Sequence, residues 1–186
     1  MNKKDFKLLI YQSSSTVFTT DEIALLLGEV NRKALKSRIN YYVGKEVIRS
    51  VKKGIYVKPK YNRLELATKI YKPSYISLET VLRENDIIFQ YDNTITAVSY
   101  LSRTIEVDGN KIIYRKIKDE YLFNNAGIIS DDNYPKAGKE RAFIDTLYLY
   151  KHFNFDNLEA IEKKIVFELT ENFNSPLITR LVKKHF

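Results

Sequence analysis

The sequence predicts an α+β protein made of two parts, a conclusion that depends on three observations. Helical periodicity alternates along the chain with short runs of β-branched and aromatic residues. Pro73 interrupts a helical stretch and marks a boundary, giving one domain of residues 1–72 and a second of residues 73–186. The net charge of +8 is also divided there, because residues 1–72 hold 16 Lys+Arg against 6 Asp+Glu and residues 73–186 hold 15 against 17. The first part therefore carries +10 and the second −2, so a polyanionic partner is expected on the first part only.

The first domain opens with two predicted helices. Apolar residues from Phe6 onward indicate a short helix that ends at the serines of residues 13–15. Thr19 and Glu22 have the spacing of a capping box, in which each side chain bonds a free backbone N–H at a helix start. A second helix is therefore expected to begin there and to end at Gly28, because glycine favours the left-handed turn after a helix.

A third helix is predicted over residues 31–43, with Leu35 and Ile39 turned inward at helical spacing. Two β-rich runs follow, residues 47–51 and 55–57, joined by a turn that contains a glycine. Three helices followed by a hairpin is the order of a winged helix-turn-helix. A further helix over residues 61–71 is interpreted as a connector.

The second domain is predicted to be mixed α+β. A helix is expected over residues 75–82 with Ser77 as its N-cap, and Asp108-Gly109 predicts a tight hairpin between two strands. The predicted strands cover residues 95–101, 103–107 and 111–117, and the remaining helices cover residues 137–150, 158–169 and 176–184.

The charge of the first domain is concentrated where a recognition helix and a wing would lie. Residues 31–60 contain ten Lys and Arg residues and a single acidic residue. Duplex DNA is the polyanion that this density fits, because neutralised phosphates release their condensed counterions. Contacts to base edges are expected from Lys33, Lys36, Ser37, Asn40 and Tyr41, contacts to phosphates from Thr19, Thr20, Asn31 and Arg32, and contacts by the wing from Arg49, Lys52 and Lys53.

Several classes of protein are disfavoured. The chain has no cysteine, which excludes disulfides, cysteine-based zinc sites and thiol nucleophiles. No signal peptide is expected behind the first lysines, and no apolar run approaches the ~20 residues that cross a bilayer. A cytoplasmic protein without a membrane partner is predicted.

Candidates for catalysis are weak. The two histidines, His152 and His185, are distant from each other in sequence and from any carboxylate motif. Asp131-Asp132 is interpreted as an exposed loop and Glu162-Lys163-Lys164 as the charged surface of a helix. We therefore predict no enzyme, no metal and no cofactor.

Three stretches of the chain resemble the AbiEi family of antitoxins and transcriptional regulators of type IV toxin–antitoxin systems. They are residues 51–57 (Val-Lys-Lys-Gly-Ile-Tyr-Val), residues 73–79 (Pro-Ser-Tyr-Ile-Ser-Leu-Glu) and residues 137–145 (Ala-Gly-Lys-Glu-Arg-Ala-Phe-Ile-Asp). The order and spacing of these stretches cover nearly the whole chain. The chain departs from the family pattern at Gly138-Lys139, where small residues or proline are frequent, and this puts the start of the local helix in question.

The resemblance implies an N-terminal domain that binds inverted repeats in its own promoter and represses transcription. It also implies a C-terminal domain that provides antitoxicity against a nucleotidyltransferase-like toxin without forming a stable complex with it. Two alternatives remain open at this point: a plain transcriptional regulator with a C-terminal sensor or assembly domain, and a nuclease that uses the winged helix for targeting.

Overall fold

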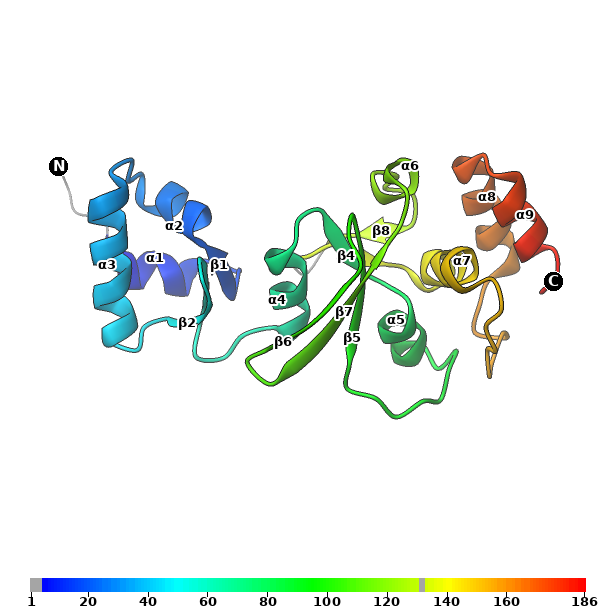
Figure 1. Cartoon of the computed structure of the whole chain (residues 1–186), viewed down its shortest axis with the longest axis horizontal. Helices are drawn as coiled ribbons and strands as arrows, with labels where there is room; N and C mark the ends of the chain where they lie inside the picture. Colours follow the sequence, from blue (N-terminus) through cyan, green and yellow to red (C-terminus); the bar gives the residue numbers. More distant parts are fainter. Residues whose placement is uncertain (1–4, 131–132) are drawn as a thin grey trace. The chain divides into compact units, whose positions relative to one another are not determined.

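A computed structural model of the chain describes residues 5–130 and 133–186. Helices and strands are mixed throughout, and the chain divides into two compact units, Met1–Ile70 and Tyr71–Phe186. This division lies two residues before the boundary predicted at Pro73. Each unit has its own sheet and its own helices (Figure 1).

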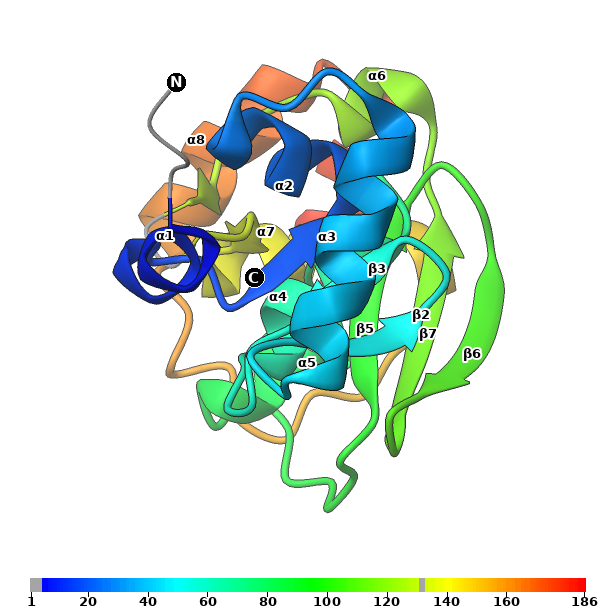
Figure 2. The same cartoon turned by 90° about the vertical axis from the view of Figure 1, so that its left-hand side faces the viewer.

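The N-terminal unit alternates short helices with a small antiparallel sheet. Its elements in order are α1 (Phe6–Gln12), β1 (Val17–Thr19), α2 (Thr20–Leu27), α3 (Arg32–Gly44), β2 (Arg49–Lys52), β3 (Ile55–Val57) and α4 (Arg63–Ile70). Figure 2 shows α3 as the long helix of this unit, beside α2 and followed by the β2–β3 hairpin.

Local chemistry explains where the first three helices of this unit, α1 to α3, begin. Asp5 caps α1 by accepting the N–H of Lys7 at 3.0 Å, and Asn31 caps α3. The predicted capping box is present at the start of α2, and Gly28 ends α2 with φ 64°. One apolar cluster joins the three helices and consists of Phe6, Ile10, Phe18, Ile23, Leu27, Leu35, Ile39, Val47 and Ile48.

The sheet of the N-terminal unit has the strand order β1-β3-β2. The β2–β3 hairpin was predicted, but its first strand begins at Arg49 and its ladder shifts register between Ser50 and Lys52. Strand β1 was not predicted. It pairs antiparallel with β3, with Val17 opposite Val57, so it closes the sheet beside α2.

The C-terminal unit is built on a six-stranded mixed sheet in the order β6-β7-β5-β4-β9-β8. Strands β5 and β7 run parallel, while β6–β7 and β4–β5 are antiparallel. The strands are β4 (Ser74–Ile76), β5 (Ile95–Ser99), β6 (Arg103–Val107), β7 (Asn110–Lys116), β8 (Ile128–Ile129) and β9 (Lys136–Ala137). The predicted hairpin is confirmed, with Val107 opposite Asn110 and positive φ at Asp108 and Gly109.

The helices of this unit are α5 (Glu79–Glu84), α6 (Asp119–Leu122), α7 (Lys139–Tyr150), α8 (Lys163–Phe173) and α9 (Pro176–Val182). Helix α5 packs on β5, α7 packs on α5, and the α8–α9 pair packs on α7 (Figure 1). Helix α7 begins directly after Gly138, where the departure from the family pattern had put its start in question.

Two predicted helices of the C-terminal unit have the wrong bounds. Residues 75–82 are not one helix: β4 ends at Ile76, Leu78 has φ 58° and no side-chain cap, and α5 begins at Glu79. Ser77 is not an N-cap because its hydroxyl donates a hydrogen bond elsewhere, to Asp145. Helix α8 begins at Lys163, five residues after its predicted start at Leu158.

Candidate nucleic-acid interface

One face of α3 is a row of exposed polar side chains. Leu35 and Ile39 are buried, as the spacing predicted, and they fix which side of the helix meets the core. Lys33, Ser37 and Asn40 lie on the opposite side and are exposed, because a 3.6-residue turn places positions i, i+4 and i+7 nearly in line.

Lys36 and Tyr41 flank this row, one on each side, and are also exposed. The structure therefore brings together the five residues that the sequence predicted for base contacts. The Tyr41 ring is 58% exposed and lies edge-on to Tyr42, which stacks in turn on Phe6. Tyr41 is thus positioned by contacts that lead to the core, although most of its surface is exposed to solvent.

The start of α3 uses its polar side chains differently. The Asn31 amide oxygen accepts the N–H groups of Lys33 at 3.0 Å and Ala34 at 3.1 Å. Arg32 lies 3.5 Å from Asp21, and both side chains are strongly exposed, so this ion pair constrains the arginine only weakly. Asn31 is therefore a helix cap, and Arg32 is a cation at the helix start with an acidic neighbour.

The two threonines predicted to contact phosphate have structural roles. The Thr19 hydroxyl accepts the Glu22 N–H at 3.2 Å, and the Glu22 carboxylate accepts the Thr19 N–H at 2.9 Å. The Thr20 N–H donates to the Gly54 carbonyl at 3.0 Å, and its hydroxyl points to the same oxygen at 3.4 Å. Thr20 thereby ties the start of α2 to the turn of the β2–β3 hairpin.

The tip of that hairpin is positively charged. Lys52 is the last residue of β2, Lys53 and Gly54 form the turn, and both lysines are exposed. Gly54 has φ 79°, a conformation that favours glycine, so the turn depends on this residue. Arg49 is exposed at the other end of β2.

One of the ten basic residues counted in the sequence, Lys58, is half-buried and binds the backbone of its own unit. The Lys58 ammonium donates to the Ser13 carbonyl at 2.7 Å and lies 5.9 Å from the centre of the Phe18 ring. Burial lowers the pKa of Lys58, and the nearby Glu65 carboxylate opposes that shift. Lys58 thus stabilises the unit internally and is not part of the exposed basic surface.

A second polar cluster, absent from the sequence predictions, lies inside the C-terminal unit. Arg141 and Asp145 of α7 are fully buried, with the arginine Nε 2.9 Å from the carboxylate. The Ser77 hydroxyl donates to the same carboxylate at 2.8 Å, and Arg141 donates to the Tyr75 hydroxyl at 2.8 Å. We call Tyr75, Ser77, Arg141 and Asp145 the buried polar cluster; it joins two of the stretches that carry the family resemblance.

The buried polar cluster is saturated with internal partners. Arg141 also donates to the backbone carbonyls of Tyr121, Asn124 and Ala126, so all five of its donors are engaged. Burial raises the pKa of Asp145, and the Arg141 guanidinium opposes that shift. With no exposed group and no vacant donor on the arginine, this cluster can stabilise the fold but offers nothing to a substrate. The i,i+4 spacing of Arg141 and Asp145 gave no signal of burial, because Lys164 and Glu168 have the same spacing and are exposed.

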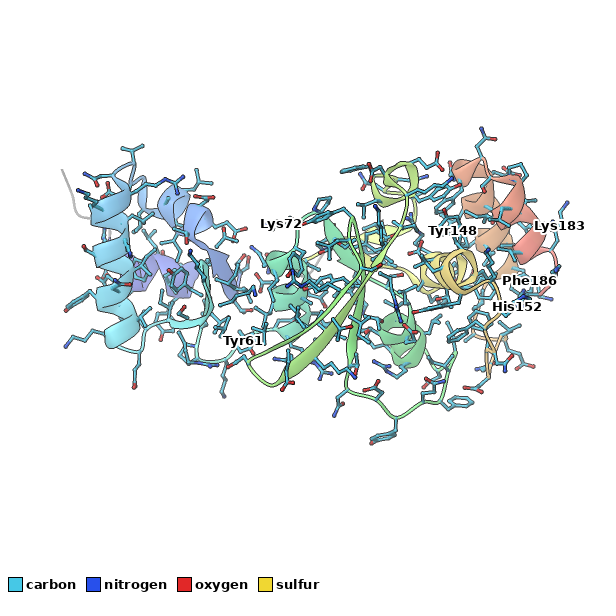
Figure 3. The ribbon with its side chains drawn as sticks, in the orientation of Figure 1. Tyr61, Lys72, Tyr148, His152, Lys183 and Phe186 are labelled. Carbon is cyan, nitrogen blue, oxygen red and sulfur yellow. The ribbon has the colours of Figure 1, made fainter. Side chains whose placement is uncertain are left out.

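The described residues that were considered for catalysis lie at or near the ends of α7, α8 and α9. His152 follows the end of α7 and is exposed (Figure 3), while the His185 ring lies 3.1 Å from the Leu181 carbonyl. Glu162, Lys163 and Lys164 are exposed around the start of α8, and Asp131-Asp132 lie outside the described residues. Within residues 5–130 and 133–186, no group of three or more His, Asp or Glu side chains is placed to hold a metal ion.

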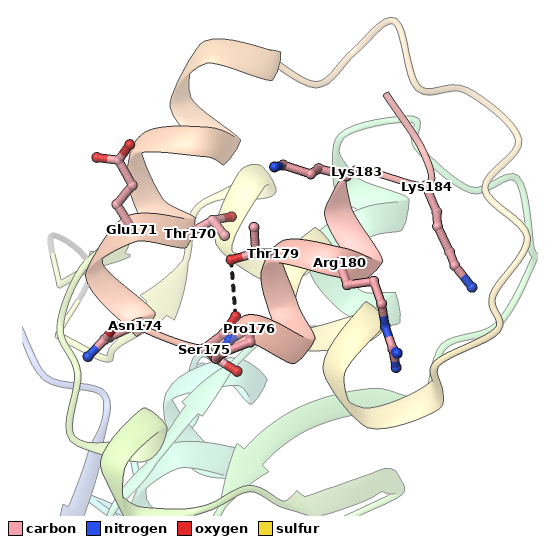
Figure 4. A pocket seen from close by; sticks show the side chains of 9 residues that line it. All are labelled: Thr170, Glu171, Asn174, Ser175, Pro176, Thr179, Arg180, Lys183 and Lys184. Atoms are coloured by element: carbon pink, nitrogen blue, oxygen red, sulfur yellow. Dashed lines mark hydrogen bonds between the residues drawn. The ribbon is translucent and has the colours of Figure 1, made fainter.

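An open groove of about 710 Å³ lies along α8 and α9 (Figure 4). The threonine hydroxyls that line it donate hydrogen bonds to backbone carbonyls one turn earlier. Thr170 donates to the Val166 carbonyl at 2.7 Å and Thr179 to the Ser175 carbonyl at 3.1 Å. Figure 4 shows Lys183 pointing away from Arg180 and Lys184. The cations therefore do not converge on one position, so the side chains that line the groove do not form an anion-binding site.

Comparison with known proteins adds no assignment. Among the described residues, each helix is too short or too polar to span a lipid bilayer. No protein-family model matches the chain, and no curated protein matches it significantly.

Proposed function

We propose that the N-terminal unit is a winged helix-turn-helix that binds double-stranded DNA. The observation that carries this proposal is the exposed row Lys33, Ser37 and Asn40 on α3, combined with the lysine-tipped β2–β3 hairpin that follows α3. In this arrangement α3 enters the major groove and the hairpin acts as a wing on the backbone. Phosphate contacts supply affinity, and the α3 face supplies sequence choice.

We propose further that the protein is an AbiEi-like antitoxin that represses its own promoter by occupying inverted repeats. Support for this step comes from the family resemblance and from the charge division, which leaves the C-terminal unit without a comparable basic excess. The C-terminal unit would then counter a nucleotidyltransferase-like toxin without a stable complex. A plain transcriptional regulator is the second candidate, and the same charge division supports it equally.

The first experiment tests DNA binding with charge reversal at the wing. Lys52→Glu with Lys53→Glu should abolish binding of the full-length protein to its promoter DNA in a mobility-shift assay. The matched control is Lys163→Glu with Lys164→Glu, because these two adjacent lysines are also exposed but belong to α8 of the C-terminal unit. Equal binding by both double variants would refute the docking model.

The second experiment separates antitoxin from plain regulator. The full-length Lys52→Glu, Lys53→Glu variant is co-expressed from an independent promoter with the neighbouring nucleotidyltransferase-like toxin. Restored growth supports a separate antitoxin function in the C-terminal unit. Persisting toxicity with both the wild type and the variant favours the plain regulator, and co-purification of toxin and antitoxin would contradict the absence of a stable complex.

A further inference from the structure

Asn31, the N-cap of α3, and Asn40, within α3, differ in what their side chains already bind. Asn31 accepts two N–H groups of its own helix, so its amide oxygen is occupied. Asn40, seven residues after Lys33, is exposed, and within residues 5–130 and 133–186 its side chain has no hydrogen-bond partner. The same holds for the side chains of Lys33 and Ser37. The row on α3 is therefore a set of unengaged donors and acceptors on a rigid helix.

We infer that α3 reads a guanine with Lys33 and an adenine with Asn40, about three base pairs apart in one half-site. This inference rests on the proposed function and adds the sequence that the N-terminal unit selects. An asparagine amide carries one donor and one acceptor side by side, which matches N6 and N7 of adenine in the major groove. A lysine ammonium has donors only, which matches O6 and N7 of guanine.

The spacing follows from the helix. Seven residues at a rise of about 1.5 Å separate Lys33 from Asn40 by about 10 Å along the axis. Base pairs stack about 3.4 Å apart, so a helix lying along the groove places these two side chains about three steps apart. Ser37 lies between them and is short, so it leaves room for the backbone of α3 to approach the bases.

The two residues that flank the row support the assignment of adenine to Asn40. Lys36 is exposed beside the row, so in the proposed docking it would contact a phosphate on one side of the groove. Tyr41, on the other side, has a lysine near its ring, with the Lys45 ammonium 5.8 Å from the ring centre. Neither has the paired donor and acceptor that singles out adenine, so the adenine preference is assigned to Asn40 alone.

The test is selection of bound duplexes from a randomised library by the full-length protein. The wild type should enrich a motif with guanine and adenine about three base pairs apart. Asn40→Ala should lose the adenine preference, keep the guanine, and bind the wild-type motif roughly tenfold to a hundredfold more weakly. Asn40→Arg should change the selected base at that position to guanine, a gain that a misfolded protein cannot produce.

The matched control is Asn172→Ala, which removes an exposed helical asparagine of the C-terminal unit and should leave the motif unchanged. A wild type that binds duplex DNA with no adenine–guanine motif, or an Asn40→Ala variant that selects the wild-type motif, would overturn this inference and leave DNA binding intact. A wild type that binds no duplex DNA even at low salt would overturn the proposed function as well.

Discussion

The sharpest quantitative test of the proposed DNA binding is its salt dependence, which follows from the exposed basic surface. We assign Lys33 to a base and leave out Arg32, whose charge Asp21 offsets, and Lys58, which binds the Ser13 carbonyl. Five exposed cations on or next to α3 and the hairpin then remain for phosphates: Lys36, Lys45, Arg49, Lys52 and Lys53. Each neutralised phosphate contributes about −0.9 to the slope of log K against log salt, so the expected slope is about −4.5 per monomer. Between 50 and 200 mM salt, affinity should therefore fall about 500-fold.

Fluorescence anisotropy with a labelled promoter duplex measures this slope over a salt series. Replacing Lys52 and Lys53 with alanine removes two of the five cations, so the slope should become about −2.7 and the loss of affinity over the same range about 40-fold. A wild-type slope shallower than about −2 would refute the docking of α3 and the wing together. A wild-type slope near −4.5 that the double variant retains would refute the assignment of the wing alone.

Three further predictions concern stability and are measured by urea unfolding of the full-length protein. Asp145→Asn should lower the free energy of unfolding by about 3–5 kcal/mol, because it leaves the buried Arg141 guanidinium without its counter-charge. Glu168→Gln, in an exposed ion pair of the same i,i+4 spacing, should lower it by less than about 1 kcal/mol. Equal losses would contradict the role of burial. Gly127→Ala should destabilise more than Gly109→Ala, since both have positive φ but only at Gly127 would the new Cβ lie 2.9 Å from a side-chain atom of α7. Asn31→Ala should cost about 1 kcal/mol through loss of the α3 cap, and an unchanged unfolding midpoint would show that the cap is dispensable.

The exposed face of α3 could be predicted from the sequence because it depends only on the helical spacing of the buried residues. Leu35 and Ile39 recur at helical spacing, and this fixes which side chains point away from the core. The capping box of α2 is equally local and was predicted. The cap that Asn31 makes on α3 is just as local, but Asn31 was interpreted as a phosphate contact instead. Features that depend on neighbours along the chain were therefore accessible.

Features that depend on residues distant in the sequence could not be predicted in this way. Strand β1 has three residues, and its pairing partner β3 lies almost forty residues later in the chain. The apolar run at Tyr75-Ile76 fits a helix or a strand equally well, and only pairing with β5 decides for a strand. The burial of Arg141 and Asp145 was hidden for the same reason, because charged residues of a helix are normally assigned to its surface.

The twelve residues predicted to contact DNA therefore divide by what their polar atoms already do. Thr19 and Asn31 use their side-chain oxygens for the first turns of α2 and α3, so a phosphate cannot replace these bonds without uncapping a helix. Thr20 joins α2 to the hairpin turn through the Gly54 carbonyl. These three residues fix the local backbone at the starts of α2 and α3 and at the hairpin turn. Asn40, by contrast, has an exposed amide with no protein partner among the described residues. We therefore expect the row on α3 to select the DNA sequence. We expect the precision of that selection to depend on the caps that stabilise the starts of α2 and α3.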